Sequence, residues 1–291
     1  MSIEESWTVQ NIIIWTTRHF HSKQIDSSRL DAEVLLASVL RCRRIDLYLR
    51  FDQPLKPDEL LCFKDLVKRR AKREPVAYIL GEKEFYGRTF KVGDGVLVPR
   101  PETEHLIDEV LRWAQPSQRE FLEILEVGAG SGCIAVTLAK ELPSAKVRTL
   151  DSSELAANFA QENSLRWQTA DRIAVEVQDF EKYDLRESLF DIVVSNPPYV
   201  AREVEKYLPS DVIGFEPHQA LFGGQAGHET MAKWIPKMLC ALKPGGFFAC
   251  EIGFDQKDRV HEILKATELC EDVRFINDYG GNSRVATAIK I

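Results

Sequence analysis

The chain has 291 residues, of which 44% are hydrophobic and 29% are charged, a composition typical of a soluble globular protein. No apolar run approaches the length that spans a bilayer, and the N-terminal residues lack a signal-peptide pattern, which favours a cytoplasmic protein without membrane association. The six cysteines and six histidines show no spacing typical of zinc sites or disulfide frameworks. We therefore expect reduced cysteines and no bound metal.

The net charge of −7 is unevenly distributed along the chain. Residues 1–80 contain 14 Lys and Arg against 11 Asp and Glu, whereas the remaining residues contain 24 against 34. Because affinity for a nucleic-acid backbone comes from basic side chains, the acidic remainder argues against a protein that grips a long duplex. The densest basic run, residues 68–73, is compatible with a solvated helix face and with a docking patch for an acidic or RNA-bound partner.

Residues 1–80 are predicted to form a small helical bundle. Residues 9–15 begin one helix, and the Asp-Ser-Ser segment 26–28 offers caps for a second. A short segment near 45–49 comes third, and the Pro-Asp-Glu segment 57–59 suits the first turn of a fourth. None of these residues forms a catalytic pattern, so we expect this part of the chain to bind a partner.

Residues 82–98 have a different character, because aromatic and β-branched residues are interrupted by Gly87, Gly93 and Gly95. This pattern predicts a β-hairpin, which we place as a connector over residues 81–99.

From residue 121 onward, apolar strand patterns alternate with helical ones, which is typical of a parallel sheet with crossover helices. The chain ends in two strand patterns joined by a short glycine-containing turn, and a terminal hairpin would make the sheet mixed. Residues 100–291 are therefore predicted to form an α/β domain around a seven-stranded mixed sheet. The strands are expected at residues 123–127, 146–150, 173–177, 190–195, 246–252, 273–279 and 284–291.

A glycine-rich loop follows the first of these strands. Its spacing is GxGxG, whereas the dinucleotide-binding pattern GxGxxG would need glycine at position 133, which is cysteine. Such a loop fits a ligand with a carboxylate and an ammonium better than one with a pyrophosphate. The acid in the strand can serve the ammonium, and the candidate ligand-binding residues are Glu126, Gly128, Ala129, Gly130, Ser131 and Gly132.

Acidic residues follow the second and third strands. Asp151 can accept two hydrogen bonds from a ribose diol, although a cap for the following helix would explain an acid there in the absence of the glycine loop. Asp179 can accept from an adenine amine and Phe180 can cover the adenine ring, although both residue types are also common in loops. Because the carboxyl ends of parallel strands share one sheet edge, the three residues and the glycine loop together indicate a pocket for S-adenosylmethionine.

The fourth strand runs directly into Asn196, Pro197, Pro198 and Tyr199. Two consecutive prolines remove two N–H donors and fix two φ angles, so the turn is stiff and leaves carbonyl oxygens bare. A strand-ending proline turn would explain the prolines, but not the asparagine and tyrosine that flank them. The turn suits a planar substrate with an NH2 group, because its oxygens accept the amine protons while the tyrosine ring packs on the plane.

These motifs resemble the N5-glutamine methyltransferases that modify peptide chain release factors, the HemK family. The resemblance extends over nearly the whole chain, and besides the glycine loop it includes residues 74–81 (EPVAYILG), 98–104 (VPRPETE), 194–199 (VSNPPY), 215–217 (FEP) and 278–285. It implies the class I S-adenosylmethionine-dependent methyltransferase fold with an N-terminal helical bundle. The implied substrate is the glutamine of the GGQ motif in class I release factors. We further expect a monomer that does not bind nucleic acid directly.

The resemblance also implies roles for individual residues. Residues 128–132, Asp151, Phe180 and Asn196 would contact S-adenosylmethionine, and residues 196–199 would hold the glutamine. The catalytic residues would be Asn196 and Pro197, whose oxygens bind the NH2 group, and Tyr199, which packs on the amide. Glu126 and Phe180 stand where many relatives carry Asp and Trp. The chain's own Gly-Gly-Gln segment, residues 223–225, is interpreted as a loop.

Three other functions compete with this interpretation. The Asn-Pro-Pro-Tyr motif also occurs in methyltransferases that act on adenine N6 or guanine N2, which need a flipped base and usually a basic groove. The acidic C-terminal region argues against them. A non-catalytic adaptor is disfavoured because both motifs are intact, and a nicotinamide oxidoreductase because of Cys133 and the terminal hairpin.

Overall fold

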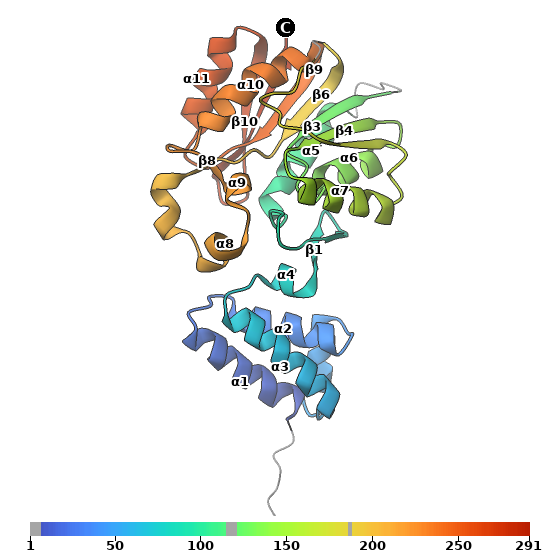
Figure 1. The fold of residues 1–291 in the computed structure, drawn as a ribbon, viewed down its shortest axis with the longest axis vertical. Helices are drawn as coiled ribbons and strands as arrows, with labels where there is room; N and C mark the ends of the chain where they lie inside the picture. The colour runs from blue at the N-terminus through green and yellow to red at the C-terminus, as the bar shows by residue number, and fades with distance from the viewer. Residues whose placement is uncertain (1–6, 115–120, 186–187) are drawn as a thin grey trace, which may run out of the picture. The chain divides into compact units, whose positions relative to one another are not determined.

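The computed structural model describes residues 7–114, 121–185 and 188–291. The chain divides into two compact units (Figure 1). The first, here called the helical unit, comprises the residues up to Gly81 together with Pro209–Phe215. The second, here called the sheet unit, comprises Glu82–Leu208 and Glu216–Ile291.

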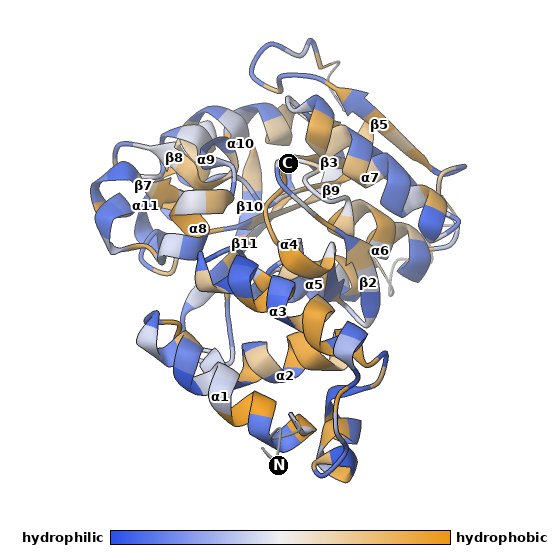
Figure 2. Ribbon diagram, turned by 60° about the horizontal axis from the view of Figure 1, so that its bottom comes forward, coloured by the Kyte–Doolittle hydropathy of each residue, from blue (hydrophilic) through white to orange (hydrophobic). Residues whose placement is uncertain are grey.

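The helical unit confirms the four expected helices and adds two short ones. Thr8 caps the first helix, since its hydroxyl oxygen accepts a hydrogen bond from Asn11 N at 3.2 Å, and Pro57 occupies the first turn of the third long helix. Both hydrophobic and hydrophilic residues occur along these helices (Figure 2). The elements are α1 (Val9–Ser22), α2 (Ser28–Val39), a 3-10 helix (Arg44–Arg50), α3 (Pro57–Ala71), α4 (Val76–Leu80) and α8 (Ser210–Phe215).

One buried arginine joins three segments of the helical unit. The side chain of Arg70 on α3 is only 5% exposed. Its Nε donates to Asp31 of α2 at 2.7 Å, and its Nη2 donates to Asp211 of α8 at 3.2 Å. The segment Pro209–Phe215 is thereby tied to helices that lie far from it in the sequence.

The sheet unit contains the predicted seven-stranded sheet (Figure 1). The strand order is β10-β11-β9-β6-β3-β4-β5, and β11 runs antiparallel to both of its neighbours, so the sheet is mixed as expected. The strands are β3 (Glu123–Val127), β4 (Lys146–Asp151), β5 (Ile173–Val177), β6 (Phe190–Ser195), β9 (Leu242–Glu251), β10 (Cys270–Asn277) and β11 (Ser283–Lys290).

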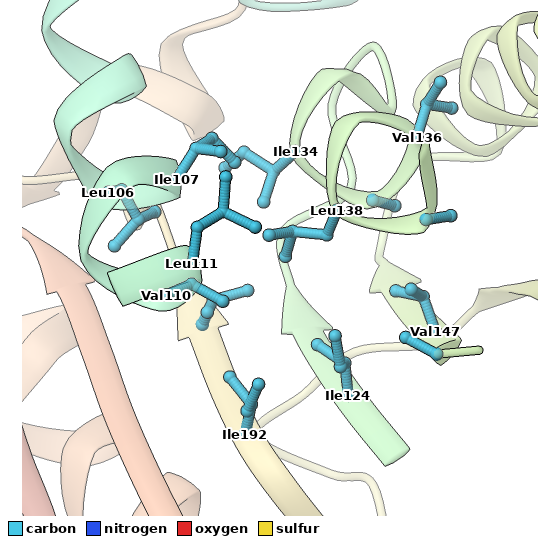
Figure 3. Close-up of a cluster of buried hydrophobic side chains, with 14 of the residues drawn as sticks. Leu106, Ile107, Val110, Leu111, Ile124, Ile134, Val136, Leu138, Val147 and Ile192 are labelled. Atoms are coloured by element: carbon cyan, nitrogen blue, oxygen red, sulfur yellow. The ribbon is translucent and has the colours of Figure 1, made fainter. Parts of the chain in front are cut away.

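Helices cover both faces of this sheet. Because successive side chains of a strand point to opposite faces, β3 sends Ile124 to one face and Leu125 to the other. Ile124 and Ile192 pack with α5 and α6 (Figure 3), whereas Leu125 and Val193 pack with α10 and α11. The helices are α5 (Glu104–Ala114), α6 (Cys133–Glu141), α7 (Glu154–Arg166), α10 (Glu229–Ala241) and α11 (Lys257–Thr267).

The predicted hairpin is formed by β1 (Glu82–Phe85) and β2 (Arg88–Lys91), which pair antiparallel across a two-residue turn. Phe85 and Phe90 are buried in the same hydrophobic cluster as α5 and α6. Trp167 Nε1, at the end of α7, donates to the carbonyl oxygen of Thr89 at 3.0 Å. The hairpin therefore packs as part of the sheet unit.

The order of the strands positions the site. From β3 the chain proceeds through β4 to β5 on one side, and then returns to place β6 on the other side of β3. Ligands of open α/β sheets bind beyond the carboxyl ends of the strands at such a switch point. The glycine loop follows β3 and the Asn-Pro-Pro-Tyr turn follows β6, so both motifs lie at this point.

Candidate active site

The glycine loop has a backbone that only glycine adopts readily at three of its positions, Gly128, Gly130 and Gly132, and the φ angle of Gly128 is +89°. Gly130 has φ +52° and lies open, with nothing within 4 Å of an added Cβ, while its N–H donates to Asp151 Oδ2 at 2.9 Å. Gly132 has φ +76°, and an added Cβ would lie 2.8 Å from Cα of Ala160 on α7. The loop is thus closely packed on its α7 side and open at Gly130.

Backbone N–H groups orient the carboxylate of Asp151. Oδ2 accepts from Gly130 N and Oδ1 accepts from Ser153 N, both at 2.9 Å. The helix cap that the sequence left open for Asp151 is instead Ser153, whose hydroxyl oxygen accepts from Ala156 N at 3.3 Å. Burial raises the pKa of Asp151, an effect that these backbone donors partly offset. Each oxygen can accept a further hydrogen bond, so the group can still receive the hydroxyls of a ribose.

Glu126 is a fully buried acid in β3. Its Oε2 accepts a hydrogen bond from the Thr149 hydroxyl at 2.6 Å, and in the described part of the chain its Oε1 has no hydrogen-bond partner. Burial raises its pKa to about 8. A buried oxygen without a partner fits a ligand that supplies a cationic donor, as the ammonium of S-adenosylmethionine does.

Asp179 and Phe180 already have partners within the protein. Oδ1 of Asp179 accepts from Glu181 N at 3.0 Å, and its Oδ2 pairs with Lys182 at 3.0 Å, which lowers the pKa of Asp179. The ring of Phe180 is buried and meets Trp234 edge-on, with ring centroids 5.5 Å apart. The proposed contacts of these two residues with adenine stay predictions.

A chain of hydrogen bonds converges beneath the Asn-Pro-Pro-Tyr turn. Asn196 Nδ2 donates to the hydroxyl oxygen of Thr103 at 3.1 Å. The Thr103 hydroxyl donates to Glu251 Oε2 at 2.6 Å, and the Tyr199 hydroxyl donates to Glu251 Oε1 at 2.9 Å. Glu251 ends β9 and is fully buried. Burial raises the pKa of Glu251, while the two hydroxyl donors lower it in part.

This chain has a direction that determines which atom Asn196 presents. The Thr103 hydroxyl has a single proton, which it donates to Glu251 Oε2, so the Thr103 oxygen is left to accept from Asn196 Nδ2. The amide nitrogen of Asn196 is therefore turned inward, and its Oδ1 stays available as an acceptor. Among the described residues, the Pro197 carbonyl accepts no hydrogen bond, so it is a second bare oxygen in the same turn.

Two glycines support the turn from behind. The turn continues into β7 (Val200–Ala201), which pairs in parallel with β8 (Phe222–Gly224). An added Cβ at Gly223 would overlap the Pro198 carbonyl oxygen, and one at Gly227 would lie 2.5 Å from the Tyr199 carbonyl oxygen. The interpretation of residues 223–225 as a loop is therefore wrong for Gly223 and Gly224. A strand of three residues is too short to show an alternating pattern, which is why the sequence concealed it.

Thr103 and Glu251 were not identified as site residues from the sequence. Glu251 had a visible signal, since it is the only charged residue in the predicted strand 246–252. A second buried acid, Glu216, accepts from Arg100 Nη2 at 2.6 Å and from Val98 N at 3.0 Å. It joins the 98–104 and 215–217 segments that carry the family resemblance.

Comparison with known proteins extends these observations. A family model described as the PrmC N-terminal domain matches residues 11–81, and one described as the methyltransferase small domain matches residues 109–213. A release factor glutamine methyltransferase from Koribacter versatilis is 42% identical over 85% of this chain and 87% of its own length. The chain belongs to the release factor glutamine methyltransferase family. Proteins of the same name from Geobacter sulfurreducens and Rhodopirellula baltica are 39% and 35% identical over 97% and 99% of this chain, and cover 96% and 98% of their own lengths.

Membership of this family confirms the resemblance inferred from the motifs and the expected class of enzyme, a methyltransferase. Within residues 7–114, 121–185 and 188–291, no helix combines the length and the hydropathy needed to cross a membrane. The same ranges contain no group of three or more His, Cys, Asp or Glu side chains arranged to hold a metal ion.

Proposed function

We propose that this protein transfers a methyl group from S-adenosylmethionine to the side-chain amide nitrogen of the glutamine in the GGQ motif of class I release factors. The names of the family relatives support this substrate. The observation that carries the proposal is the pair of bare acceptors at Asn196 and Pro197, because a glutamine amide offers two N–H donors to match them.

Three elements of the switch point are suited to hold S-adenosylmethionine, which supplies an electrophilic methyl group when bound. Glu126 Oε1 would receive the ammonium, and the open backbone at Gly130 allows close approach of the amino-acid tail. Asp151, oriented by two backbone donors, would receive the ribose hydroxyls. Asp179 and Phe180 are proposed to contact the adenine.

The protein's own residues act on the acceptor amide. An amide nitrogen is a poor nucleophile, because its lone pair is delocalised into the carbonyl group. Hydrogen bonds from the NH2 group to Asn196 Oδ1 and the Pro197 carbonyl would fix the nitrogen in place and favour some tetrahedral character. Tyr199 is proposed to pack against the amide plane. Positioning of this kind can supply about 7–11 kcal/mol of a barrier.

The proton balance needs no strong base before transfer. The nitrogen–methyl bond forms as the sulfur–methyl bond breaks, and the nitrogen becomes far more acidic once it carries the methyl group. Its extra proton then passes to water. The two acceptor oxygens stabilise the charge that develops on the N–H groups during the step.

We further propose that residues 1–80 bind the release factor, with 81–99 as the connector and 100–291 as the methyltransferase domain, and that the protein acts as a cytoplasmic monomer without direct nucleic-acid contacts. Support for the compartment comes from the six cysteines, which are all free. The acidic charge of the residues after 80 disfavours a nucleic-acid substrate.

The test incubates the purified enzyme and methyl-labelled cofactor with purified release factor, and in separate reactions with DNA and with ribosomal RNA. Label on the GGQ glutamine, located by mass spectrometry of the digested release factor, supports the proposal. Label on nucleic acid alone overturns it in favour of a base methyltransferase.

A further inference from the structure

An apolar groove of about 580 Å³ runs along the helical unit between α1 and α3. Ile12 and Trp15 line it from α1, and Leu60, Phe63 and Val67 line it from α3. The α3 residues recur at three- and four-residue intervals, so they form one continuous stripe along the helix. The residues that line the groove on the α3 side run from Leu60 to Lys72, a length of about 18 Å at 1.5 Å per residue.

Large aromatic side chains are left exposed at this groove. Trp7 and Trp15 are 41% and 49% exposed and lie edge-to-face, with ring centroids 6.1 Å apart. The hydroxyl of Thr16, which also lines the groove, is buried and has no partner among the described residues. Exposed tryptophans clustered over an apolar floor are typical of protein-binding surfaces.

The rim of the groove is basic. Lys64, Lys68 and Lys72 follow one another at four-residue intervals on α3, so they share a face of the helix. Lys23 lies at the end of α1 on the same groove. The lining residues include no Asp or Glu, and of the four lysines only Lys68 has an ion-pair partner among the described residues, the exposed Asp65. A partner with acidic residues along one flank would match this rim.

We propose that the groove binds an amphipathic helix of the protein substrate, with its apolar face on the stripe and its acidic flank along the α3 lysines. This assignment rests on the proposed function, since it gives the helix to the release factor. A helix that spans the groove would have about three turns, which is the length over which helix-in-groove recognition usually places its anchors.

The aromatic rings are poorly placed for the alternative, single-stranded RNA. Binding of RNA would use open ring faces on which bases stack. One face of Trp15 is covered by His19, whose ring stacks on it with centroids 5.1 Å apart and an interplanar angle of 11°. The rings of Trp7 and Trp15 also contact each other edge-to-face, which takes up part of the remaining ring surface. The rest of the floor is largely aliphatic, which suits the apolar face of a helix.

The test compares two substrates of the full-length enzyme, intact release factor and a short peptide that carries only the GGQ glutamine. In the double variant K64E/K72E, we expect KM for the release factor to rise about tenfold or more with kcat unchanged. The reason is that the acidic flank of the bound helix would be repelled by the two introduced glutamates. Kinetics with the short peptide should be unchanged. The matched control K140E/K265E makes the same charge change at exposed lysines of α6 and α11 and should leave both substrates within about twofold.

The variant Trp15→Ala tests the apolar part of the same groove and should also raise KM for the release factor alone. Circular dichroism of each variant establishes that the helices remain folded.

An unchanged KM for release factor in both groove variants would overturn the docking site and leave the proposed function intact. Failure of the wild-type enzyme to methylate release factor would instead overturn the proposed function. Competition by an RNA oligonucleotide that is lost in K64E/K72E would replace the helix by RNA as the occupant.

Discussion

Gly223 of β8 lies directly against the carbonyl oxygen of Pro198, with no room between them for a side chain. We therefore expect Gly223→Ala to displace the Asn-Pro-Pro-Tyr turn and to reduce kcat by about 100-fold or more, since misplacement of a reacting group by about 1 Å has an effect of that size. Cofactor affinity should change much less, because Glu126 and Asp151 lie on other strands. Methyl-transfer kinetics and calorimetric titration with S-adenosylmethionine measure the two effects.

The control for this prediction is Gly214→Ala, because an added Cβ at Gly214 meets nothing within 4 Å. Wild-type kcat in Gly223→Ala would contradict the packing argument. Gln225→Ala should retain activity, since the Gly-Gly-Gln segment supports the turn through Gly223. Mass spectrometry should find no methyl group on Gln225 after incubation with the cofactor.

The second prediction concerns Asn196, which is proposed to accept from the substrate NH2 group. Asn196→Ala should lower kcat by about 100-fold or more, as the loss of a catalytic hydrogen-bonding group does in other enzymes. Binding of S-adenosylmethionine should be largely retained. Asn158→Ala, at an exposed position of α7, is the matched control and should behave as wild type. Normal turnover of release factor by Asn196→Ala would remove Asn196 from the mechanism.

Thr103 is predicted to act by orienting Asn196. Valine at position 103 keeps the shape but can neither accept from Asn196 nor donate to Glu251, so the Asn196 amide would lose its fixed direction. We expect Thr103→Val to reduce kcat about tenfold, because the hydrogen bond that orients Asn196 is lost, with cofactor affinity unchanged. Thr103→Ser restores the hydroxyl and should restore kcat. If serine and valine behave alike, Thr103 contributes only packing.

Glu126 should couple cofactor binding to pH. Its pKa is about 8 in the folded protein, raised by burial from an ordinary value of 4.5, so the carboxyl is mostly protonated at pH 7. An ammonium bound at Oε1 favours the carboxylate, so binding at pH 7 should release about one proton, and affinity should rise with pH up to about 8. Calorimetry in buffers of different ionisation enthalpy measures this release, which Glu126→Gln should abolish.

The same shift sets the sign of the effect of Glu126 on stability without cofactor. Because the pKa of Glu126 is higher in the folded protein than in the unfolded chain, its contribution to the free energy of unfolding is complete below a pH of about 4.5. That contribution is lost as the pH rises towards the folded-state pKa of about 8. Glu126→Gln should therefore flatten the fall in melting temperature over this range. A variant with the slope of the wild type would contradict the assigned pKa.

Arg70 should contribute strongly to the stability of the helical unit. Arg70→Met leaves the carboxylate of Asp31, 9% exposed, without its cationic partner in a buried position. Loss of one member of a buried ion pair typically costs about 3–5 kcal/mol. Hydrogen exchange of α2 and α3 measures the change. The surface pair of Arg259 and Glu262 supplies the control, since Arg259→Met should change stability by less than about 0.5 kcal/mol.

The parts of the fold that depend on local pattern were predictable from the sequence. The bounds of β3, β5 and β6 match the apolar runs at 123–127, 173–177 and 190–195. β9 begins at Leu242 rather than at 246, because the Pro-Gly-Gly segment 244–246 interrupts the apolar run inside the strand. The positions of the glycine loop and the Asn-Pro-Pro-Tyr turn at one sheet edge followed from the alternation of strands and helices.

The hydrogen-bond chain of the site was not predictable in this way. Thr103 lies 93 residues from Asn196 and 148 residues from Glu251. Asn196 and Glu251 are close because β9 lies beside β6, and Thr103 reaches them from the 3-10 helix Pro101–Thr103. Hydrophobic alternation identifies strands but does not determine which strands become neighbours. The role of Gly223 was hidden for a related reason, since its constraint is a carbonyl oxygen that belongs to Pro198, 25 positions earlier in the chain.

The assignment of Pro209–Phe215 to the helical unit has a practical consequence for dissecting this protein. A polypeptide that begins at Glu82 would still carry this segment, although Arg70, which binds Asp211, would be gone. Conversely, a fragment that ends at Gly81 would lack Asp211. Either truncation separates Arg70 from Asp211, so deletion of the N-terminal residues would combine any loss of partner binding with the loss of this ion pair. Point substitutions in the groove avoid this ambiguity.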